Sequence, residues 1–291
     1  MSLIALQNGP AASVISTNGG AVLGLTVGGV PLLRPAVDDA EAINSGCFPL
    51  VPFGNRIKGN AFTFRELGYA FLPNVFWDKH YLHGEGWLDD WAVEETRADK
   101  AVLSHAHDAS RIPYSYRSQQ VFTLTPHGMT MELTVTNKGE HAMPFGLGWH
   151  PHFPMTPGTT LQTKTGRMWT ELPGWLPGEP IVLPDEFDFS TPKQLPEHWV
   201  NNAFEDWSGS ALVHWPERQG KLRIEASSIF KTMFLFVSDK SFDPHFSRDF
   251  FALEPMSHLP DAHNMKNLDG LHILEPGETL RGAIDLTLEE G

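Results

Sequence analysis

Short alternating apolar and polar runs, broken by glycine and proline along the whole chain, constrain the fold more than any other feature. In residues 130–136 every second side chain is apolar, which is the pattern of a strand with one buried face. The same alternation returns at residues 283–288, after a Pro-Gly turn. Glycine (26) and proline (23) are spread along all 291 residues and are not gathered into one linker. The sequence therefore predicts many short strands joined by turns.

Further runs support this reading. Turn residues at 126–128 separate the apolar run 121–124 from the strand that follows, so we expect a hairpin there. Residues 222–226 and 232–237 predict two more strands, the second of them buried. Convincing amphipathic helices are scarce. This combination favours an all-β fold, as in a sandwich or a barrel.

Domain organisation is predicted to be simple. The Pro-rich stretch 173–196 carries several acidic residues and is interpreted as a long surface loop. Strand patterns on its two sides look alike, and no internal repeat is found. We therefore expect one domain that spans residues 1–291, as a monomer or a homodimer.

The charge balance excludes several classes of partner. The chain has 21 Lys and Arg against 35 Asp and Glu, a net charge of −14. An acidic surface repels phosphate groups, so we expect no nucleic acid and no membrane as partners. No apolar run approaches the roughly 20 residues of a membrane span, and no secretory signal is recognised. Cys47 is the only cysteine, which fits a cytoplasmic protein.

Two segments carry an arginine and a histidine in unusual surroundings. Arg56 follows Asn55 among apolar residues, and its planar fork suits a hydroxyl or a carboxylate. A structural arginine that binds loop carbonyls is the alternative. His83 precedes Gly84 and Gly86, which allow positive φ or close approach, so we expect a constrained turn. A purely structural histidine remains the alternative there.

The third segment, residues 146–153, packs two histidines and two aromatic rings between glycines and prolines. In an extended chain His150 and His152 lie on the same face. Such a pair suits either proton transfer or a metal ion. No glutamate follows closely, because the next acidic residue is Glu171. We therefore expect proton transfer, and no metal.

Other reactive patterns are weaker. A second pair, His105 and His107, is flanked by small and polar residues and is interpreted as an exposed turn. Cys47 has no adjacent base, and the chain has neither a nucleophile elbow nor a Gly-rich phosphate loop. Nucleophilic catalysis and nucleotide binding are therefore not expected.

The fourth segment ends a strongly apolar run with Glu254. A carboxyl group in such surroundings loses solvent, and this loss raises its pKa towards the range that suits a general base. The alternative is a glutamate at a strand end that faces water.

Taken together and in this order, the four segments resemble the aldose 1-epimerase (galactose mutarotase) family. The resemblance runs from about residue 19 to residue 288 and implies a large antiparallel β-sandwich, often called a supersandwich. The site would lie in a cleft on one sheet and would use no metal or organic cofactor. The matching segments are residues 55–57, 82–84, 148–153, 254–255 and 260–264.

The resemblance also implies roles for individual residues. His150 would be the general acid that protonates the sugar ring oxygen, and Glu254 the general base at the anomeric hydroxyl. His83 would be a second histidine near the ring oxygen. Asn55 and Arg56 would bind substrate, with Arg56 as a clamp on sugar hydroxyls.

One position departs from the family pattern. Where the family usually has an aspartate that binds sugar hydroxyls, this chain has Asn201. An amide accepts and donates hydrogen bonds but carries no charge. The identity of the preferred sugar is therefore open.

The expected chemistry sets further conditions on the site. We expect the carboxylate and the imidazolium to stand on opposite sides of the sugar, with His150 protonated at rest because a carboxylate lies nearby. Trp149, Phe153 and Trp77 are candidates to stack on the apolar face of the sugar.

Three functions remain open from the sequence. The leading one is mutarotation of a neutral free aldose, because clustered cations for a phosphate are few. A non-catalytic carbohydrate-binding sandwich is the second, motivated by Asn201. An epimerase of a phosphorylated sugar is the third.

Overall fold

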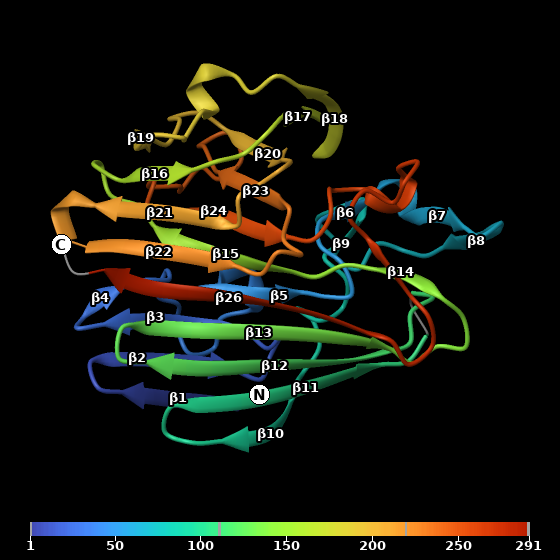
Figure 1. Ribbon diagram of the computed structural model, residues 1–291, viewed down its shortest axis with the longest axis horizontal. Helices are drawn as coiled ribbons and strands as arrows, with labels where there is room; N and C mark the ends of the chain where they lie inside the picture. The colour runs from blue at the N-terminus through green and yellow to red at the C-terminus, as the bar shows by residue number, and fades with distance from the viewer. Residues whose placement is uncertain (1, 110–111, 219, 290–291) are drawn as a thin grey trace.

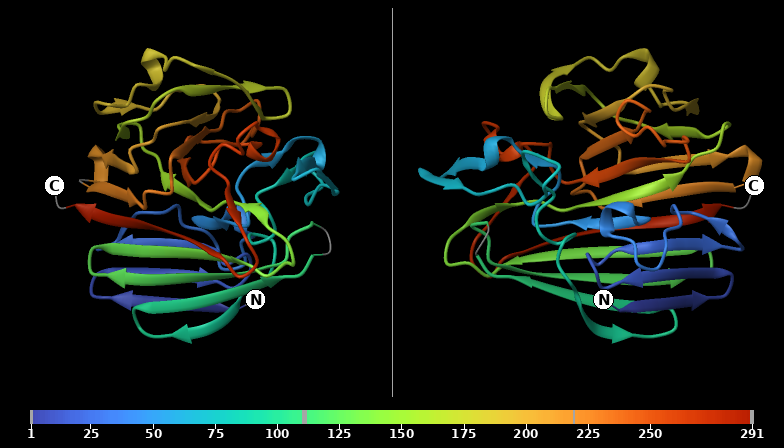
Figure 2. Two further views of the ribbon diagram at one scale, coloured as in Figure 1. Left: turned by 45° about the vertical axis from the view of Figure 1, so that its right-hand side comes forward. Right: turned by 180° about the vertical axis from the view of Figure 1, so that it is seen from behind.

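The computed structural model describes residues 2–109, 112–218 and 220–289, and it is almost entirely β-structure. Two large antiparallel sheets pack face to face, as Figures 1 and 2 show from three directions. The predicted all-β sandwich is therefore confirmed. Within the described residues, no helix has the length and apolar character needed to cross a bilayer.

The first sheet has 11 strands and carries four of the polar residues singled out in the sequence: His150, His152, Asn201 and Glu254. In spatial order its strands are β1 (Leu3–Asn8), β2 (Ala11–Ser16), β3 (Val22–Val27), β5 (Cys47–Leu50), β15 (Gly148–Pro154), β24 (Phe250–Met256), β23 (Thr232–Val237), β20 (Val200–Phe204), β17 (Met168–Leu172) and β18 (Leu176–Ile181), with β4 (Val30–Pro31) paired to β3.

The second sheet has nine strands. In spatial order they are β10 (Ala92–Thr96), β11 (Lys100–His107), β12 (Tyr116–Thr125), β13 (Gly128–Asn137), β26 (Thr279–Glu289), β22 (Gly220–Ala226), β21 (Ser210–Trp215), β16 (Thr160–Thr163) and β19 (Lys193–Gln194).

Three two-stranded ribbons complete the β-structure, and they gather at the end of the sandwich on the right of Figure 1. They are β14 (Met143–Phe145) with β25 (His272–Leu274), β6 (Arg56–Ile57) with β9 (Tyr81–Leu82), and β7 (Ala61–Phe64) with β8 (Leu67–Ala70). The helical turns are short 3-10 segments: η1 (Ala42–Asn44), η2 (Lys58–Asn60), η3 (Asp185–Phe187), η4 (Pro216–Arg218) and η5 (Ala262–Asn264).

The strands expected from alternation are confirmed. β12 and β13 form the predicted hairpin, with Thr125 paired to Gly128 across the turn. β26, β22 and β23 cover the other predicted runs. β22 and β26 pair side by side, although almost 60 residues separate them in the chain.

The prediction of a long surface loop at residues 173–196 was wrong. This stretch contains β18, η3 and β19. β18 pairs with β17 and has Pro177 and Pro180 in the ladder. Proline is tolerated there because β18 is an edge strand and needs partners on one side only.

The prediction that His105 and His107 form an exposed turn was also wrong. Both lie on β11 and are buried, with exposed fractions of 4% and 8%. His105 Nε2 lies 3.1 Å from Asp89 Oδ2. The inner face of β11 is polar at this end, so apolar alternation gave no sign of the strand.

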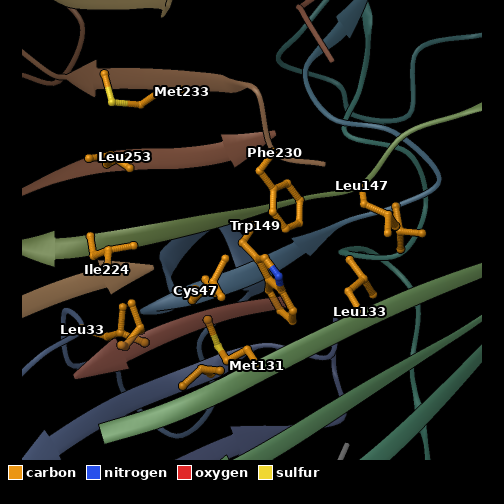
Figure 3. Close-up of a cluster of buried hydrophobic side chains, with 14 of the residues drawn as sticks. Leu33, Cys47, Met131, Leu133, Leu147, Trp149, Ile224, Phe230, Met233 and Leu253 are labelled. Carbon is orange, nitrogen blue, oxygen red and sulfur yellow. The ribbon is translucent and has the colours of Figure 1, made fainter. Parts of the chain in front are cut away.

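The core lies between the two large sheets. Trp149 on β15 is fully buried in a cluster with Met131 and Leu133 from β13 of the opposite sheet (Figure 3). Because side chains alternate along a strand, the neighbours His150 and His152 point to the other face of β15. The 11-stranded sheet thus has a packed face and a face available for a site.

Candidate active site

The site begins with a row of side chains across four strands. Strand pairing sets Phe48 of β5 opposite His150 of β15, and Phe234 of β23 opposite Glu254 of β24. β15 and β24 are themselves neighbours, and His150 Nε2 lies 3.2 Å from Glu254 Oε1. Residues more than 100 positions apart in the chain, such as His150 and Glu254, therefore meet in one row.

A second row runs parallel to the first. His152 pairs with Ala252, Ala252 with Phe236, and Phe236 with Asn201 of β20. These residues lie two positions along their strands from the first row, so they share its face. The two rows form the floor of the site.

A cavity of about 380 Å³ lies over this floor. Its volume is in the range of small-molecule sites. Its wall contains all six residues predicted to act in catalysis or substrate binding. They are Asn55, Arg56, His83, His150, Asn201 and Glu254.

Burial dominates the electrostatics of the His150–Glu254 pair. Glu254 is only 2% exposed, and desolvation raises the pKa of its carboxyl well above the ordinary value, against the guanidinium of Arg56. Desolvation lowers the pKa of His150 well below its ordinary value, and His152, His83 and Arg56 lower it further. Burial thus favours the uncharged form of both groups.

Two expectations about this pair were wrong. The pKa shift of His150 does not favour a resting imidazolium, because burial opposes it and the neighbouring His152, His83 and Arg56 oppose it further. The side chains of His150 and Glu254 also do not stand across a sugar, since their polar atoms are at hydrogen-bond distance. Both would approach a substrate from the same side.

His83 is held by the main chain of Asn55. The Asn55 N–H donates to His83 Nδ1 at 2.9 Å, and the His83 N–H donates to the Asn55 carbonyl at 2.9 Å. His83 has a φ of 60°, so the predicted constrained turn is confirmed. Because Nδ1 accepts a hydrogen bond, the ring hydrogen lies on Nε2. Burial also lowers the pKa of His83 well below its ordinary value, so the ring is a neutral donor.

Arg56 pairs with a carboxylate and not with loop carbonyls. Its Nε donates to Asp78 Oδ2 at 2.7 Å, and its guanidinium lies 5.0 Å from the ring centre of Trp175. Asp78 is buried and was not singled out in the sequence. The ion pair fixes one edge of the guanidinium and leaves the remainder at the cavity wall.

Asn201 lies at the far end of the second row and is 9% exposed. Its Nδ2 is buried and has no hydrogen-bond partner among the described residues. A buried donor without a partner is costly. Its position in the cavity wall makes a ligand oxygen a suitable acceptor.

The aromatic residues were only partly predicted. Trp149 and Phe153 are fully buried in the core, so they do not stack on a ligand. Trp77 does line the cavity. The flat surface beside His150 is Phe48, whose ring is parallel to the imidazole within 16° at 4.5 Å.

Phe48 and Asp78 carried no usable signal in the sequence. Each lies in an ordinary local context, and its role depends on strand pairing or on a partner 22 residues away.

The arrangement of the described side chains offers no metal site. Among residues 2–109, 112–218 and 220–289, no three His, Cys, Asp or Glu side chains are arranged to hold an ion.

The proteins that this chain resembles identify its family. The family model for aldose 1-epimerase matches residues 2–287. The chain is 41% identical over 290 residues to the uncharacterized protein YphB of Escherichia coli K12, and the match covers 99% of each chain.

Solved structures show the same fold. A crystal structure from Escherichia coli K12 has a TM-score of 0.96 and 40% identity, with 100% of this chain and 99% of that chain covered. A galactose mutarotase-like protein from Clostridium acetobutylicum has a TM-score of 0.84 at 20% identity, with 99% and 95% covered. Because the family model spans nearly the whole chain, this protein belongs to the aldose 1-epimerase family.

Proposed function

We propose that the protein is an aldose 1-epimerase that interconverts the α and β anomers of a neutral free aldose. The observation that carries this proposal is the 3.2 Å contact between His150 Nε2 and Glu254 Oε1 on the floor of the cavity. Mutarotation requires one proton to leave the anomeric hydroxyl and one to reach the ring oxygen. Both oxygens are bonded to the same carbon, so an acid and a base side by side suit the reaction.

In the forward direction Glu254 takes the proton of the anomeric hydroxyl, and His150 gives a proton to the ring oxygen. The bond between the anomeric carbon and the ring oxygen breaks, and the open aldehyde rotates before the ring closes on its other face. Each proton transfer contributes about 10²–10⁴-fold. Two such contributions make a credible catalyst with protein groups alone.

The reactive form is the imidazolium–carboxylate pair. It holds the same single proton as the uncharged pair that burial favours, so the two forms interconvert by a transfer across the 3.2 Å contact. Arg56 lowers the pKa of Glu254 and so favours its carboxylate, while it also lowers the pKa of His150. His83, as a neutral Nε2–H donor, would hydrogen-bond the ring oxygen, and Arg56 and Asn55 would bind sugar hydroxyls.

The charges around the cavity favour a neutral sugar. Arg34 and Arg56 are both in its wall, but each has a carboxylate partner. Arg34 Nε lies 3.4 Å from Asp249 Oδ2, and Arg56 is bonded to Asp78. Neither arginine is left with unbalanced charge for a phosphate. A phosphosugar epimerase would instead show competition by phosphate esters and not by neutral sugars.

Polarimetry and NMR exchange on fresh α-galactose, glucose, arabinose and rhamnose test the proposal. We expect catalysed anomer exchange, with kcat/KM lowered about 10²–10⁴-fold in Glu254→Gln and in His150→Asn. Glu225→Gln is the matched control, because Glu225 is an exposed residue of β22 in the other sheet. Full activity in Glu254→Gln would remove the proposed base.

The second candidate is a sugar-binding sandwich without catalysis. The observation behind it is Asn201, an amide where the family usually has an aspartate. Saturable binding of these sugars without faster anomer exchange would favour this candidate over the enzyme.

A further inference from the structure

His152 is a buried histidine of the cavity that the proposed proton transfers do not use. It lies two residues after His150 on the same face of β15 and is 3% exposed. Its ring centre is 4.8 Å from that of His150 and 5.1 Å from that of Phe250. The cavity wall includes all three side chains. His152 is therefore placed to touch a ligand without touching Glu254.

The main chain fixes the tautomer of His152. Its Nδ1 lies 2.6 Å from the carbonyl oxygen of Ser45. A carbonyl only accepts hydrogen bonds, so Nδ1 carries the hydrogen and Nε2 carries a lone pair. Nε2 makes no hydrogen bond within the part of the chain that the structure describes. The lone pair is left for the cavity.

The surroundings also keep this ring neutral. Burial lowers the pKa of His152 to about 4, and the guanidinium of Arg34 opposes protonation further. Arg34 is held nearby, because its guanidinium lies 4.0 Å from the ring centre of Phe250, which His152 also contacts. Near neutral pH, Nε2 is thus an acceptor and not a proton donor.

His83 and His152 present opposite hydrogen-bond polarity to one cavity. His83 Nδ1 is occupied by a main-chain N–H, so its Nε2–H donates. His152 Nδ1–H is bonded to a main-chain carbonyl, so its Nε2 accepts. A sugar hydroxyl that donates a hydrogen bond can therefore pair with His152 Nε2 but not with His83 Nε2–H. Two fixed and opposite groups can orient a ring that carries several similar hydroxyls.

We propose that His152 is a specificity-determining residue, whose Nε2 accepts a hydrogen bond from one sugar hydroxyl outside the hemiacetal centre. The site then selects aldoses that carry this hydroxyl in the orientation that reaches the second row of the floor. This inference rests on the proposed function, since it assumes a sugar in the cavity. It adds a residue and a hydroxyl requirement that the proton transfers do not contain.

Two substitutions separate the two nitrogens of His152. In His152→Asn the amide nitrogen can take the place of Nδ1 and keep the bond to Ser45, but no atom replaces Nε2. In His152→Gln the longer amide reaches the place of Nε2 and keeps an acceptor in the cavity, but loses the bond to Ser45. The pair distinguishes loss of the acceptor from general damage to the fold.

The measurement is a set of ratios, for wild type and both variants. Glucose and galactose are compared with their 2-, 3-, 4- and 6-deoxy analogues, by kcat/KM for anomer exchange and by dissociation constants from NMR titration. We expect the wild type to disfavour one deoxy analogue by roughly tenfold, the scale of one hydrogen bond. In His152→Asn this ratio should approach one, because the variant binds and converts the parent sugar less well, while the deoxy analogue is unaffected. His152→Gln should retain most of the ratio.

The outcomes are distinct from those for the proposed function. If the wild type binds sugar but does not accelerate exchange, the epimerase proposal fails and the binding ratios still test His152. Unchanged ratios for every deoxy analogue in His152→Asn would overturn the inference. Collapse of the ratio in both variants, or absence of sugar binding in the wild type, would also overturn it.

Discussion

Three histidines of the cavity differ in how firmly the main chain fixes their protons. Asn55 occupies Nδ1 of His83, and Ser45 occupies Nδ1 of His152, so the tautomers of both rings are set. His150 is different, because its Nδ1 is buried without a partner among the described residues and its Nε2 contacts Glu254. A ring whose tautomer is not fixed can gain and lose protons at Nε2. This residue is therefore the one of the three suited to proton transfer.

At the residue scale, the pH profile of activity should report the His150–Glu254 pair. Burial raises the pKa of Glu254, so the pair keeps its last proton to higher pH, and burial lowers the pKa of His150, so a second proton binds only at lower pH. The active, singly protonated pair lies between these limits. We expect a broad bell, with an acid limb below the ordinary pKa of histidine and an alkaline limb above that of glutamic acid. Each limb should approach about a tenfold change per pH unit, because one proton is involved.

The same profile in Glu254→Gln supplies the control. With the carboxyl group gone, only His150 titrates in the pair, so the residual rate should lose one limb. Two unchanged limbs in this variant would assign the bell to other groups. The two apparent pKa values belong to the pair and not to either residue alone.

At the scale of elements, the segment after β9 positions His83. Gly86 N–H donates to the carbonyl of Val51 at 3.1 Å, and Trp91 Nε1 donates to the carbonyl of Gly86 at 2.7 Å. Gly84 has a φ of 70°, and an added Cβ would collide with the carbonyl oxygen of Val51. The segment thus lies against the Val51–Pro52 main chain with no space for a side chain at this position.

Gly84→Ala should therefore raise the activation free energy of the reaction by more than it lowers the free energy of unfolding. The collision displaces the turn that holds His83, and a shift of about 1 Å at a catalytic group can cost roughly 10²-fold in rate. The positive φ alone costs on the order of 1 kcal/mol. Gly28→Ala is the matched control, because Gly28 also has a positive φ but has open space around it. Measurement of kcat/KM and of the free energy of unfolding for both variants checks this; equal activity in the two would contradict it.

The elements also show how far the sequence determines the result. Alternation is a local signal, so β13 and β26 were predictable from their own residues. β18 was not, because its prolines are acceptable only at a sheet edge, and edge position depends on the whole sheet. His105 was misjudged for a related reason, since the polar partner that its buried ring contacts, Asp89, lies outside the strand.

Site residues that belong to a sequence motif could be predicted, and those that reach the site only through strand pairing could not. His150 and Glu254 stood out because polar residues interrupted apolar or glycine-rich runs. Phe48 became part of the site only through its register with β15. That His150 and Glu254 can share one proton follows from the distance between their side chains, and no sequence pattern contains this distance.

At the scale of the whole molecule, the 11-stranded sheet serves both stability and the site. On β15, Trp149 is part of the core between the sheets, and the next residue, His150, is part of the cavity floor. The same rigid sheet that packs the core holds Glu254 where water is excluded. One oxygen of this carboxyl group, Oε2, has no hydrogen-bond partner among the described residues. The fold therefore bears a cost for this residue, and the proposed activity would account for it.

The sign of this cost follows from the raised pKa of Glu254. The favourable contribution of its uncharged form is fully present below the unfolded pKa near 4.5, and it is lost as the pH rises through the raised folded value. Glu254→Gln removes the ionisation and keeps the shape. We expect the variant to have strongly reduced activity and yet to be more stable than the wild type near pH 8, by roughly 0.5–2 kcal/mol. Near pH 4 the difference should shrink towards zero, because the wild-type carboxyl is then largely protonated in both states. Denaturant unfolding at the two pH values measures this difference in the free energy of unfolding. The control variant Glu225→Gln should show no comparable gain. If Glu254→Gln were less stable than the wild type near pH 8, His150 and Arg56 would offset the burial of the carboxylate completely.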